Sequence, residues 1–226
     1  MKNRKYKAID KSMAVFDRVE RICKKNLTDE STLEDFLDIY NQKIRKELDT
    51  ERADSVKSAL SILWVYGFFN LTKRLEKELN RNVKSPKDRV SLDEIKEGIF
   101  DTELEKSQKK AIKYATKNSK VVKKQGAKAV AVGVSGVTAL GMVKKFTSRS
   151  KTVMNVRAVD MISKKEIVQA KKFGYKYFTF YAELDSRTTE ICRNLHGTTF
   201  KVEEGKIGVN IPPMHCNCRS HCLFHN

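Results

Sequence analysis

YKYFTFYAELDSRTTEICRNLHGTTF, residues 175–200, is the stretch in which the spacing of apolar side chains changes from helical to extended. Its first part, Tyr175 to Ala182, is rich in aromatic residues and alternates along the chain, which is typical of a strand. A helical pattern precedes it and ends at Gly174, where glycine provides a C-terminal stop. The stretch therefore predicts that a mainly helical chain ends in a small domain that combines helix and strand.

The first hundred residues predict a helical bundle or an array of helical hairpins. The strongest apolar stripe runs from Val56 to Leu79, with positions that repeat every three or four residues. An earlier helix is predicted after a capping box at Ser31 and Glu34, and a later one begins at Ser91 and Glu94.

A chain of 226 residues has room for a helical body and a smaller appended domain. The predicted fold class is mainly α with a small α+β C-terminal domain that contains a short β-sheet. Three parts are expected: a helical body over residues 1–105, a basic and Gly/Ala-rich connecting segment over 106–150, and the C-terminal domain over 151–226.

The chain carries a net charge of +18, and most of this excess lies in one region. Between Lys106 and Lys172 there are eighteen lysines or arginines and two acidic residues. Such a surface favours double-stranded DNA, bound nonspecifically through phosphate neutralisation. An ordinary solvated lysine surface is the alternative, and membrane contact is a lesser one. The predicted DNA-binding residues are Lys109, Lys110, Lys113, Lys117, Lys120, Lys123, Lys124 and Lys128.

Secretion and membrane insertion are not indicated. No apolar segment follows the basic start MKNRKYKAID, so we expect no secretory signal. The longest uncharged run, Ala129 to Val143, is shorter than the roughly 20 residues that span a bilayer. A small-residue helix packed against a neighbour and a mobile or membrane-active segment remain alternatives for it. Five cysteines, an odd number, fit a reducing cytoplasm better than a disulfide framework.

Residues with metal-binding side chains gather at the C-terminus. All four histidines and four of the five cysteines lie between Cys192 and His225. Thiolate and imidazole suit zinc, and the spacing His215-x-x-Cys218 allows a tight loop to direct both side chains at one ion. A small module also gains stability from a metal that it cannot gain from its core. For Cys192 alone, packing as a small apolar residue is the alternative. Further donors nearby are Cys216, His221, Cys222 and His225.

The same region carries a multipart motif. LDSRTTEICRNLHGTTF, residues 184–200, is followed by IPPMHCNCRS, residues 211–220, and a helix with an early arginine leads into the aromatic strand. These segments resemble the C-terminal signature of the phage Mu F-like minor head proteins, in which Asp-x-Arg-Thr and Cys precede Pro-Pro-x-His-x-x-Cys-Arg. The resemblance covers about 70 to 75 residues, from Asn155 to the end.

The resemblance maps the family motif onto Asp185, Arg187, Cys192, Gly197, His215, Cys218 and Arg219. Many members carry further cysteines where this chain has Thr189 and Ser220, so a second ligand pair is not expected here. A closed structural zinc site from Cys192, His215, Cys218 and Asp185 is the favoured set, with Cys216 or Cys222 as other fourth ligands. Asp185 has the alternative roles of capping the helix near Thr188 or pairing with Arg187 or Arg219.

The resemblance implies a non-enzymatic minor capsid protein of a tailed phage. It would reside in the virion, in the head interior or at the portal, after assembly in the host cytoplasm. Its partners would be the portal protein and other head proteins, with no small-molecule substrate, and ejection with the genome is a further implication.

The alternative function is that of a zinc-dependent hydrolase or nuclease, or of a phage-derived toxin domain. It would need a general base, for which Glu190, Glu203 and Glu204 are candidates by proximity alone. The motifs HExxH and HxE…CxxC are absent.

Overall fold

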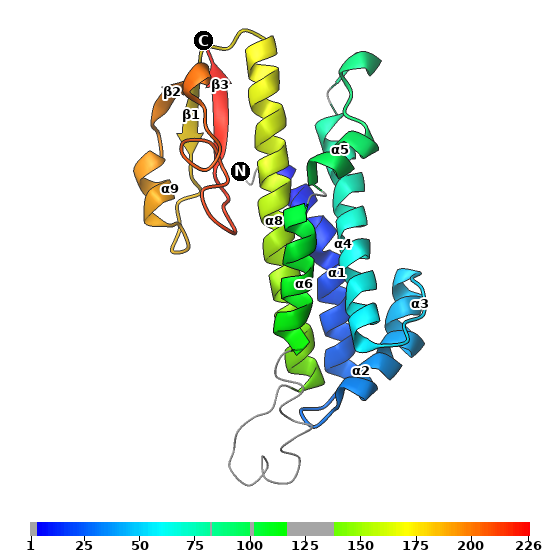
Figure 1. The fold of residues 1–226 in the computed structure, drawn as a ribbon. Helices are drawn as coiled ribbons and strands as arrows, with labels where there is room; N and C mark the ends of the chain where they lie inside the picture. The colour runs from blue at the N-terminus through cyan, green and yellow to red at the C-terminus, as the bar shows by residue number, and fades with distance from the viewer. Residues whose placement is uncertain (1–3, 82, 100–101, 117–137) are drawn as a thin grey trace. The chain divides into compact units, whose positions relative to one another are not determined.

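The computed structural model describes residues 4–81, 83–99, 102–116 and 138–226. Figure 1 shows many helices and a small antiparallel sheet near the C-terminus, which confirms the predicted fold class. The helices are α1 (Arg4–Asn26), α2 (Leu33–Ile39), α3 (Arg45–Leu48), α4 (Val56–Leu79), α5 (Leu92–Ile99), α6 (Thr102–Thr116), α8 (Ala139–Lys172) and α9 (Glu190–Leu195). A π-helical turn, η1 (Tyr40–Ile44), joins α2 to α3, and two 3₁₀ turns are η2 (Pro86–Asp88) and η3 (Val202–Glu204). The strands are β1 (Tyr177–Tyr181), β2 (Thr199–Lys201) and β3 (His221–His225).

Contacts divide the chain into two compact units. Unit 1 comprises Met1–Tyr6, Leu75–Ile99 and Thr152–Asn226. Unit 2 comprises Lys7–Arg74 and Phe100–Lys151. Each unit is therefore built from segments that lie far apart in the sequence, and α1, α4 and α8 contribute residues to both.

Aromatic side chains from three helices form the core of unit 2. Phe16 of α1, Trp64 and Phe68 of α4 and Phe146 of α8 are all buried. The ring centroid of Phe146 lies 6.2 Å from that of Phe16 and 6.3 Å from that of Trp64. Trp64 and Phe68 are neighbours on one helix face, with ring centroids 5.4 Å apart. The predicted apolar stripe is thus the buried face of α4, whose bounds the sequence predicts correctly.

The start of α2 differs from the prediction by one residue. The N-cap is Thr32, whose hydroxyl accepts a hydrogen bond from the Asp35 backbone at 3.2 Å, while the Asp35 carboxylate accepts one from the Thr32 backbone at 2.6 Å. Ser31 belongs to the preceding turn, where its hydroxyl accepts a bond from the Thr28 backbone at 2.9 Å. Because Ser31 and Thr32 are each followed three residues later by an acid, the sequence fits both frames.

The start of α5 is confirmed. The hydroxyl of Ser91 accepts a hydrogen bond from the Glu94 backbone at 3.1 Å, and α5 begins at the next residue, Leu92. The predicted end of the long helix before the aromatic strand is confirmed as well, because α8 ends at Lys172 and Gly174 has a φ of 71°.

The sheet in unit 1 has strand order β2-β1-β3, with both pairs antiparallel. Phe178 of β1 lies opposite Phe200 of β2 and Phe224 of β3, with ring centroids 5.5 and 5.8 Å away. These rings, together with Phe180, form an inner face that packs against Ala170 of α8 in a single apolar cluster. The helix and the sheet therefore share one small core in this unit.

Tyrosine and histidine cover the outer face of the sheet. Tyr177 lies beside His225 and Tyr181 beside His221, with near-parallel rings whose centroids are 6.0 and 5.9 Å apart. His196 meets the ring of Tyr181 edge-on at 5.7 Å. Of the donors considered as further ligands, His221 and His225 thus face away from the inner cluster.

Strand β3 is not among the predicted elements. Cys222 and Phe224 point inward while Leu223 is exposed, an alternation that is typical of a strand. In the sequence, the histidines and cysteines of this segment favour an interpretation as metal ligands. In the structure, His221 and His225 instead stack on tyrosines of β1. The alternation of buried and exposed residues is the signal that favours a strand over a set of ligands.

Candidate metal centre

Cys192 reaches the interior of unit 1 from the short helix α9. This helix follows Thr189, and Gly197 ends the turn after it with a φ of 80°, a conformation that favours glycine. The side chain of Cys192 is 2% exposed and belongs to the apolar cluster beneath the sheet. Gly197, one of the positions matched to the family motif, thus directs the chain from α9 into β2.

His215 and Cys218 lie at the two ends of a tight turn just before β3. The Cys218 backbone N–H donates a hydrogen bond to the His215 carbonyl at 3.2 Å. Asn217 has a φ of 72°, in the left-handed region that asparagine adopts more readily than most residues. Because the turn is hydrogen-bonded, the first and last residues of the motif His-x-x-Cys are held near one another.

The three side chains converge. The Sγ atom of Cys192 lies 3.3 Å from Nε2 of His215 and 4.0 Å from Sγ of Cys218, and all three donor atoms lie within 4.8 Å of one another. On one tetrahedral zinc ion, two thiolates are about 3.8 Å apart and a thiolate and an imidazole nitrogen about 3.5 Å apart, for bonds of about 2.3 and 2.0 Å. The two separations from Cys192 therefore fit a shared ion with displacements of a few tenths of an ångström, and the donors of His215 and Cys218 lie no more than 4.8 Å apart.

The second ring nitrogen of His215 has a partner that suits metal binding. Nδ1 lies 3.0 Å from the carbonyl oxygen of Cys216, which can only accept a hydrogen bond. When Nδ1 carries the proton, the lone pair of Nε2 is free to bind an ion, and Nε2 is the nitrogen beside Cys192. The backbone carbonyl of Cys216 thus orients the imidazole ring of His215.

Burial disfavours the charged thiolate form of two cysteines in this cluster, Cys218 and Cys222. Burial raises the pKa of the Cys218 thiol, and hydrogen bonding with Met214 and Ser220 acts in the opposite direction. Burial also raises the pKa of Cys222 to about 12. A divalent ion at the three donors would favour the thiolate form of its ligands by direct bonding.

Asp185, the fourth predicted ligand, is not part of this group of donors. Its carboxylate accepts hydrogen bonds from the Arg219 guanidinium at 2.6 and 2.8 Å and from the Arg187 backbone at 2.8 Å. The hydrogen bond from Arg219 and that from the Arg187 backbone hold the pKa of Asp185 well below its usual range. Of the roles considered for Asp185, the structure shows pairing with Arg219 at 2.6 and 2.8 Å and a longer approach of the Arg187 side chain at 3.6 Å.

The remaining cysteines near the site differ in burial. Cys216 is exposed, whereas Cys222 lies in the same apolar cluster as Cys192 and Cys218 but outside the group of three converging donors. In the part of the chain that the structure describes, three protein donors therefore converge. A tetrahedral ion would have one further position.

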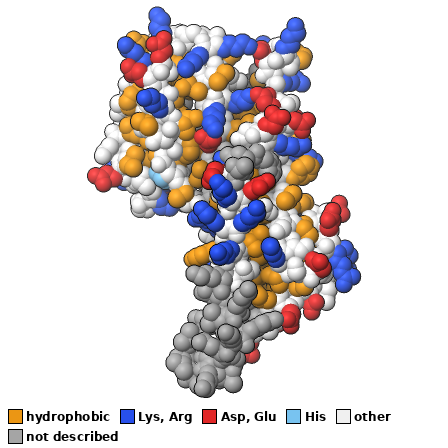
Figure 2. Space-filling model, viewed as in Figure 1, with side chains coloured by type: hydrophobic (Ala, Val, Ile, Leu, Met, Phe, Trp, Pro, Cys, Tyr) orange, Lys and Arg blue, Asp and Glu red, His pale blue; other side chains and the backbone are white. Residues whose placement is uncertain are grey.

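Of the eight predicted DNA-binding lysines, three lie within the described residues. Lys109, Lys110 and Lys113 are exposed on α6, and Lys117, Lys120, Lys123, Lys124 and Lys128 lie outside the described residues. Figure 2 shows Lys and Arg side chains gathered over the region of α6. The first turns of α8, also in unit 2, add basic residues that the predicted set does not contain: Lys144, Lys145 and Arg149. Lys145 Nζ lies 5.8 Å from the ring centroid of exposed Tyr114 on α6.

The uncharged run Ala129 to Val143 falls mostly outside the described residues. Its last part, from Ala139, forms the first turn of α8, where Ala139, Met142 and Val143 are buried. Within the described ranges, no helix has the length and apolar character needed to cross a bilayer.

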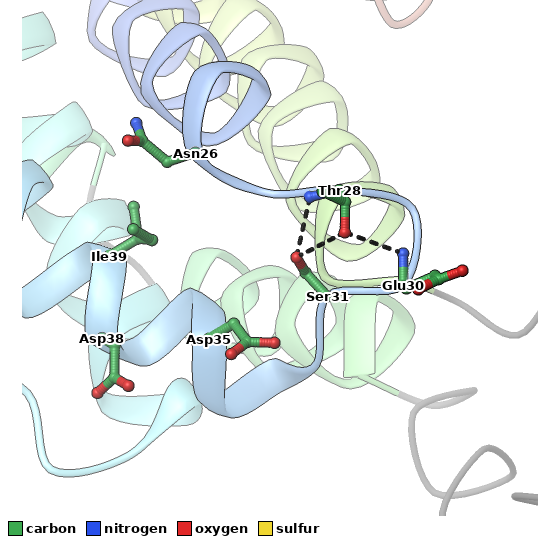
Figure 3. Close-up of a pocket in the computed structure, with 7 residues that line it drawn as sticks. All are labelled: Asn26, Thr28, Glu30, Ser31, Asp35, Asp38 and Ile39. Atoms are coloured by element: carbon green, nitrogen blue, oxygen red, sulfur yellow. Dashed lines mark hydrogen bonds between the residues drawn. The ribbon is translucent and has the colours of Figure 1, made fainter.

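Unit 2 contains a polar hollow of about 310 Å³ between the end of α1 and α2 (Figure 3). Its lining includes the carboxylates of Glu30, Asp35 and Asp38. The contacts among its residues are those of a turn and a helix start: Thr28 and Ser31 bond one another, and Asp35 accepts a hydrogen bond from the backbone of Thr32, the N-cap of α2. We therefore assign no ligand to this hollow.

The fold and the site define a class of protein in which helices precede a small α+β module, and that module brings together two cysteines and a histidine that could hold a metal ion. A family model described as phage Mu protein F like protein matches residues 73–223, about two thirds of the sequence. The chain therefore belongs to the phage Mu protein F-like family. No curated protein and no solved structure matches it significantly.

Proposed function

We propose that this chain is a non-enzymatic minor head protein of a tailed bacteriophage that acts in head morphogenesis. The observation that carries the proposal is the family match over residues 73–223, which includes α5, α6, α8 and most of the C-terminal sheet. In this role the chain assembles in the host cytoplasm and resides in the virion, at the portal or inside the head. Its partners are the portal protein and other head proteins.

The assembly role is tested by co-expression with the portal protein of the same phage. We expect the two to co-purify, and we expect mass spectrometry of purified heads to find this chain in fewer copies than the major capsid protein. Heads that form normally and contain none of it would contradict the role. Comparison of full particles with particles that have ejected their genome tests whether the chain leaves with the DNA.

We further propose that residues 151–226 form a domain whose rigidity depends on a structural zinc ion held by Cys192, His215 and Cys218. The distances of 3.3 and 4.0 Å among the donors support this, as does the orientation of His215 by the Cys216 carbonyl. The small sheet, with two strands of five residues and one of three, supplies limited apolar area, so a metal would contribute much of the stability.

We also propose that unit 2 contacts double-stranded DNA nonspecifically through its phosphates. Exposed lysines at Lys106, Lys109, Lys110 and Lys113 recur at helical spacing along α6. Lys145 of α8 lies near Tyr114 of α6, so the two helices contribute to one basic surface. Phosphate contact without base reading fits a protein that must accept any sequence in the packaged genome.

One observation favours a second candidate function, that of a zinc hydrolase or nuclease. Among the described residues only three donors converge, and a catalytic zinc site keeps its fourth position open for water. A hydrolase also needs a general base close to the water that the ion would bind. Under the proposed structural role, the zinc-loaded protein is expected to cleave neither DNA nor RNA. Cleavage that disappears with a chelator and in a Cys192→Ser variant would favour the enzyme.

A further inference from the structure

The two segments that carry the metal donors are joined by a pair of charged side chains. Asp185 lies in the loop between β1 and α9, seven residues before Cys192. Arg219 directly follows Cys218. The link between Asp185 and Arg219 thus spans the same two segments whose cysteines approach to 4.0 Å.

Hydrogen bonds with neighbouring residues hold Asp185 in its loop. Its backbone N–H donates to the Thr188 hydroxyl at 2.8 Å, and its carboxylate accepts the Arg187 backbone N–H at 2.8 Å. Its carbonyl accepts a bond from Thr188 N–H at 3.2 Å and a longer one from the Arg193 guanidinium at 3.4 Å. Because Arg193 belongs to α9, the position of Asp185 is tied to the helix that carries Cys192.

Arg219 meets this carboxylate with two parallel hydrogen bonds. One guanidinium nitrogen donates to Oδ2 at 2.8 Å and the other to Oδ1 at 2.6 Å, which is the geometry of a strong, directional pair. The Arg219 side chain is 22% exposed, and the Glu183 carboxylate lies 3.4 Å from it. A shift of the turn that holds His215 and Cys218 would strain both bonds at once.

We propose that the Asp185–Arg219 pair is a positioning clamp that sets the separation of the Cys192 and Cys218 sulfurs before a metal ion binds. The clamp rests on the proposed metal site and assigns Asp185 a role other than ligation. Donors that are already in place lose little conformational freedom on binding, so the clamp raises metal affinity without contacting the ion. Arg219 and Asp185 are positioning residues in this sense.

The alternative for Asp185, direct ligation, makes a different prediction for the spectrum of bound cobalt. Co²⁺ can replace Zn²⁺ in the full-length protein, and its visible absorption reports the number and type of its ligands. If Asp185 is a clamp, Asp185→Asn leaves the spectrum at saturation unchanged and weakens binding by about tenfold. If Asp185 is a ligand, the spectrum of the variant itself changes, which overturns the clamp.

The two arginines near Asp185 provide a matched control. Arg187 approaches the carboxylate only at 3.6 Å with its side chain, which is 73% exposed. We expect Arg219→Ala to weaken cobalt binding as much as Asp185→Asn does, and Arg187→Ala to have little effect. The double variant Asp185→Asn/Arg219→Ala should be no weaker than either single variant, because both remove one interaction. Additive losses, or equal effects of the two arginines, would overturn the clamp.

The experiment separates failure of the clamp from failure of the metal site. If the wild-type protein takes up neither Co²⁺ nor Zn²⁺, the proposed metal site is wrong. If the wild type binds and both clamp variants bind with unchanged affinity, the site stands and the clamp is wrong. Should Arg219→Ala fail to fold, Arg219→Lys keeps the charge and loses the paired geometry, and it is expected to show an intermediate loss of affinity.

Discussion

The Sγ atoms of Cys192 and Cys218 lie 4.0 Å apart in unit 1, although 26 positions of the sequence separate them. The first is carried on α9 and the second on the turn before β3. Two thiols that approach so closely in an apolar cluster suit either a shared ion or simple packing. The nearby Nε2 of His215 favours the ion, because an imidazole nitrogen at 3.3 Å from a sulfur adds a ligand of the type that zinc prefers.

A chelator is expected to destabilise the wild-type protein and to leave a Cys218→Ser variant unaffected. Zinc at about 1,000 times its Kd stabilises a folded protein by about 4 kcal/mol, and the variant lacks one of the three donors. Thermal unfolding with and without chelator measures the difference. Cys23→Ala is the matched control, because Cys23 is a buried cysteine of α1 outside the donor group, so its response to the chelator should equal that of the wild type.

Truncation of Phe178 is expected to be far more costly than truncation of a residue on the exposed side of the sheet. Phe178 is fully buried among Phe200 and Phe224, so Phe178→Ala should lower the free energy of unfolding by about 3–5 kcal/mol. Leu223, 53% exposed on β3, is the control, and Leu223→Ala should cost less than about 0.5 kcal/mol. Urea denaturation followed by circular dichroism measures both. Equal losses would show that the inner face is not the core.

DNA binding is expected to weaken steeply with salt and to depend on the lysines of α6. Each lost phosphate contact lowers the slope of log K against log salt by about 0.9, so Lys109→Ala/Lys110→Ala/Lys113→Ala should lower it by about 2.7. Fluorescence anisotropy with duplexes of two unrelated sequences measures the slope and the lack of specificity. The control is Lys24→Ala/Lys25→Ala/Lys46→Ala, which removes the same charge from exposed positions on α1 and α3. An equal effect of the two triple variants would point to net charge alone.

The contribution of Asp185 to stability is expected to disappear in acid. Its pKa is lowered in the folded protein, whereas in the unfolded chain it titrates near the ordinary value of about 3.9. A lowered pKa stabilises the folded state above the unfolded value, and this stabilisation is lost as the pH falls toward the folded value. With chelator present throughout, the melting temperatures of the wild type and Asp185→Asn should differ by a constant amount at neutral pH and converge below about pH 4. A difference that does not depend on pH would mean that charge is not involved.

Much of the fold follows from patterns within single segments. The apolar stripe of α4, the aromatic alternation of β1 and the stop at Gly174 are local signals, and the structure confirms each of them. The capping box predicted at Ser31 and Glu34 was wrong by one residue, because Thr32 and Asp35 satisfy the same local rule. The choice between the two frames depends on the preceding turn, where the Ser31 hydroxyl accepts a hydrogen bond from the Thr28 backbone.

The types of donor at the candidate site could be predicted from the sequence, but the hydrogen-bond partner of Asp185 could not. Residue type and spacing bring Cys192, His215 and Cys218 together in the sequence analysis and in the structure. The partner of Asp185 could not be chosen from sequence, because ligation, capping and pairing with an arginine all suit a carboxylate at a strand end. The bond to Arg219 depends on how two loops 34 positions apart meet, and no local pattern encodes this.

X-ray absorption at the zinc K-edge of the full-length protein, expressed in zinc-containing medium, tests the metal centre most directly. A zinc centre at Cys192, His215 and Cys218 should give one zinc per chain with two sulfur neighbours at about 2.3 Å and an imidazole nitrogen at about 2.0 Å. Loss of one sulfur neighbour is expected in Cys218→Ser. A protein that carries no zinc, or zinc surrounded by oxygen and nitrogen without sulfur, would rule out this metal centre.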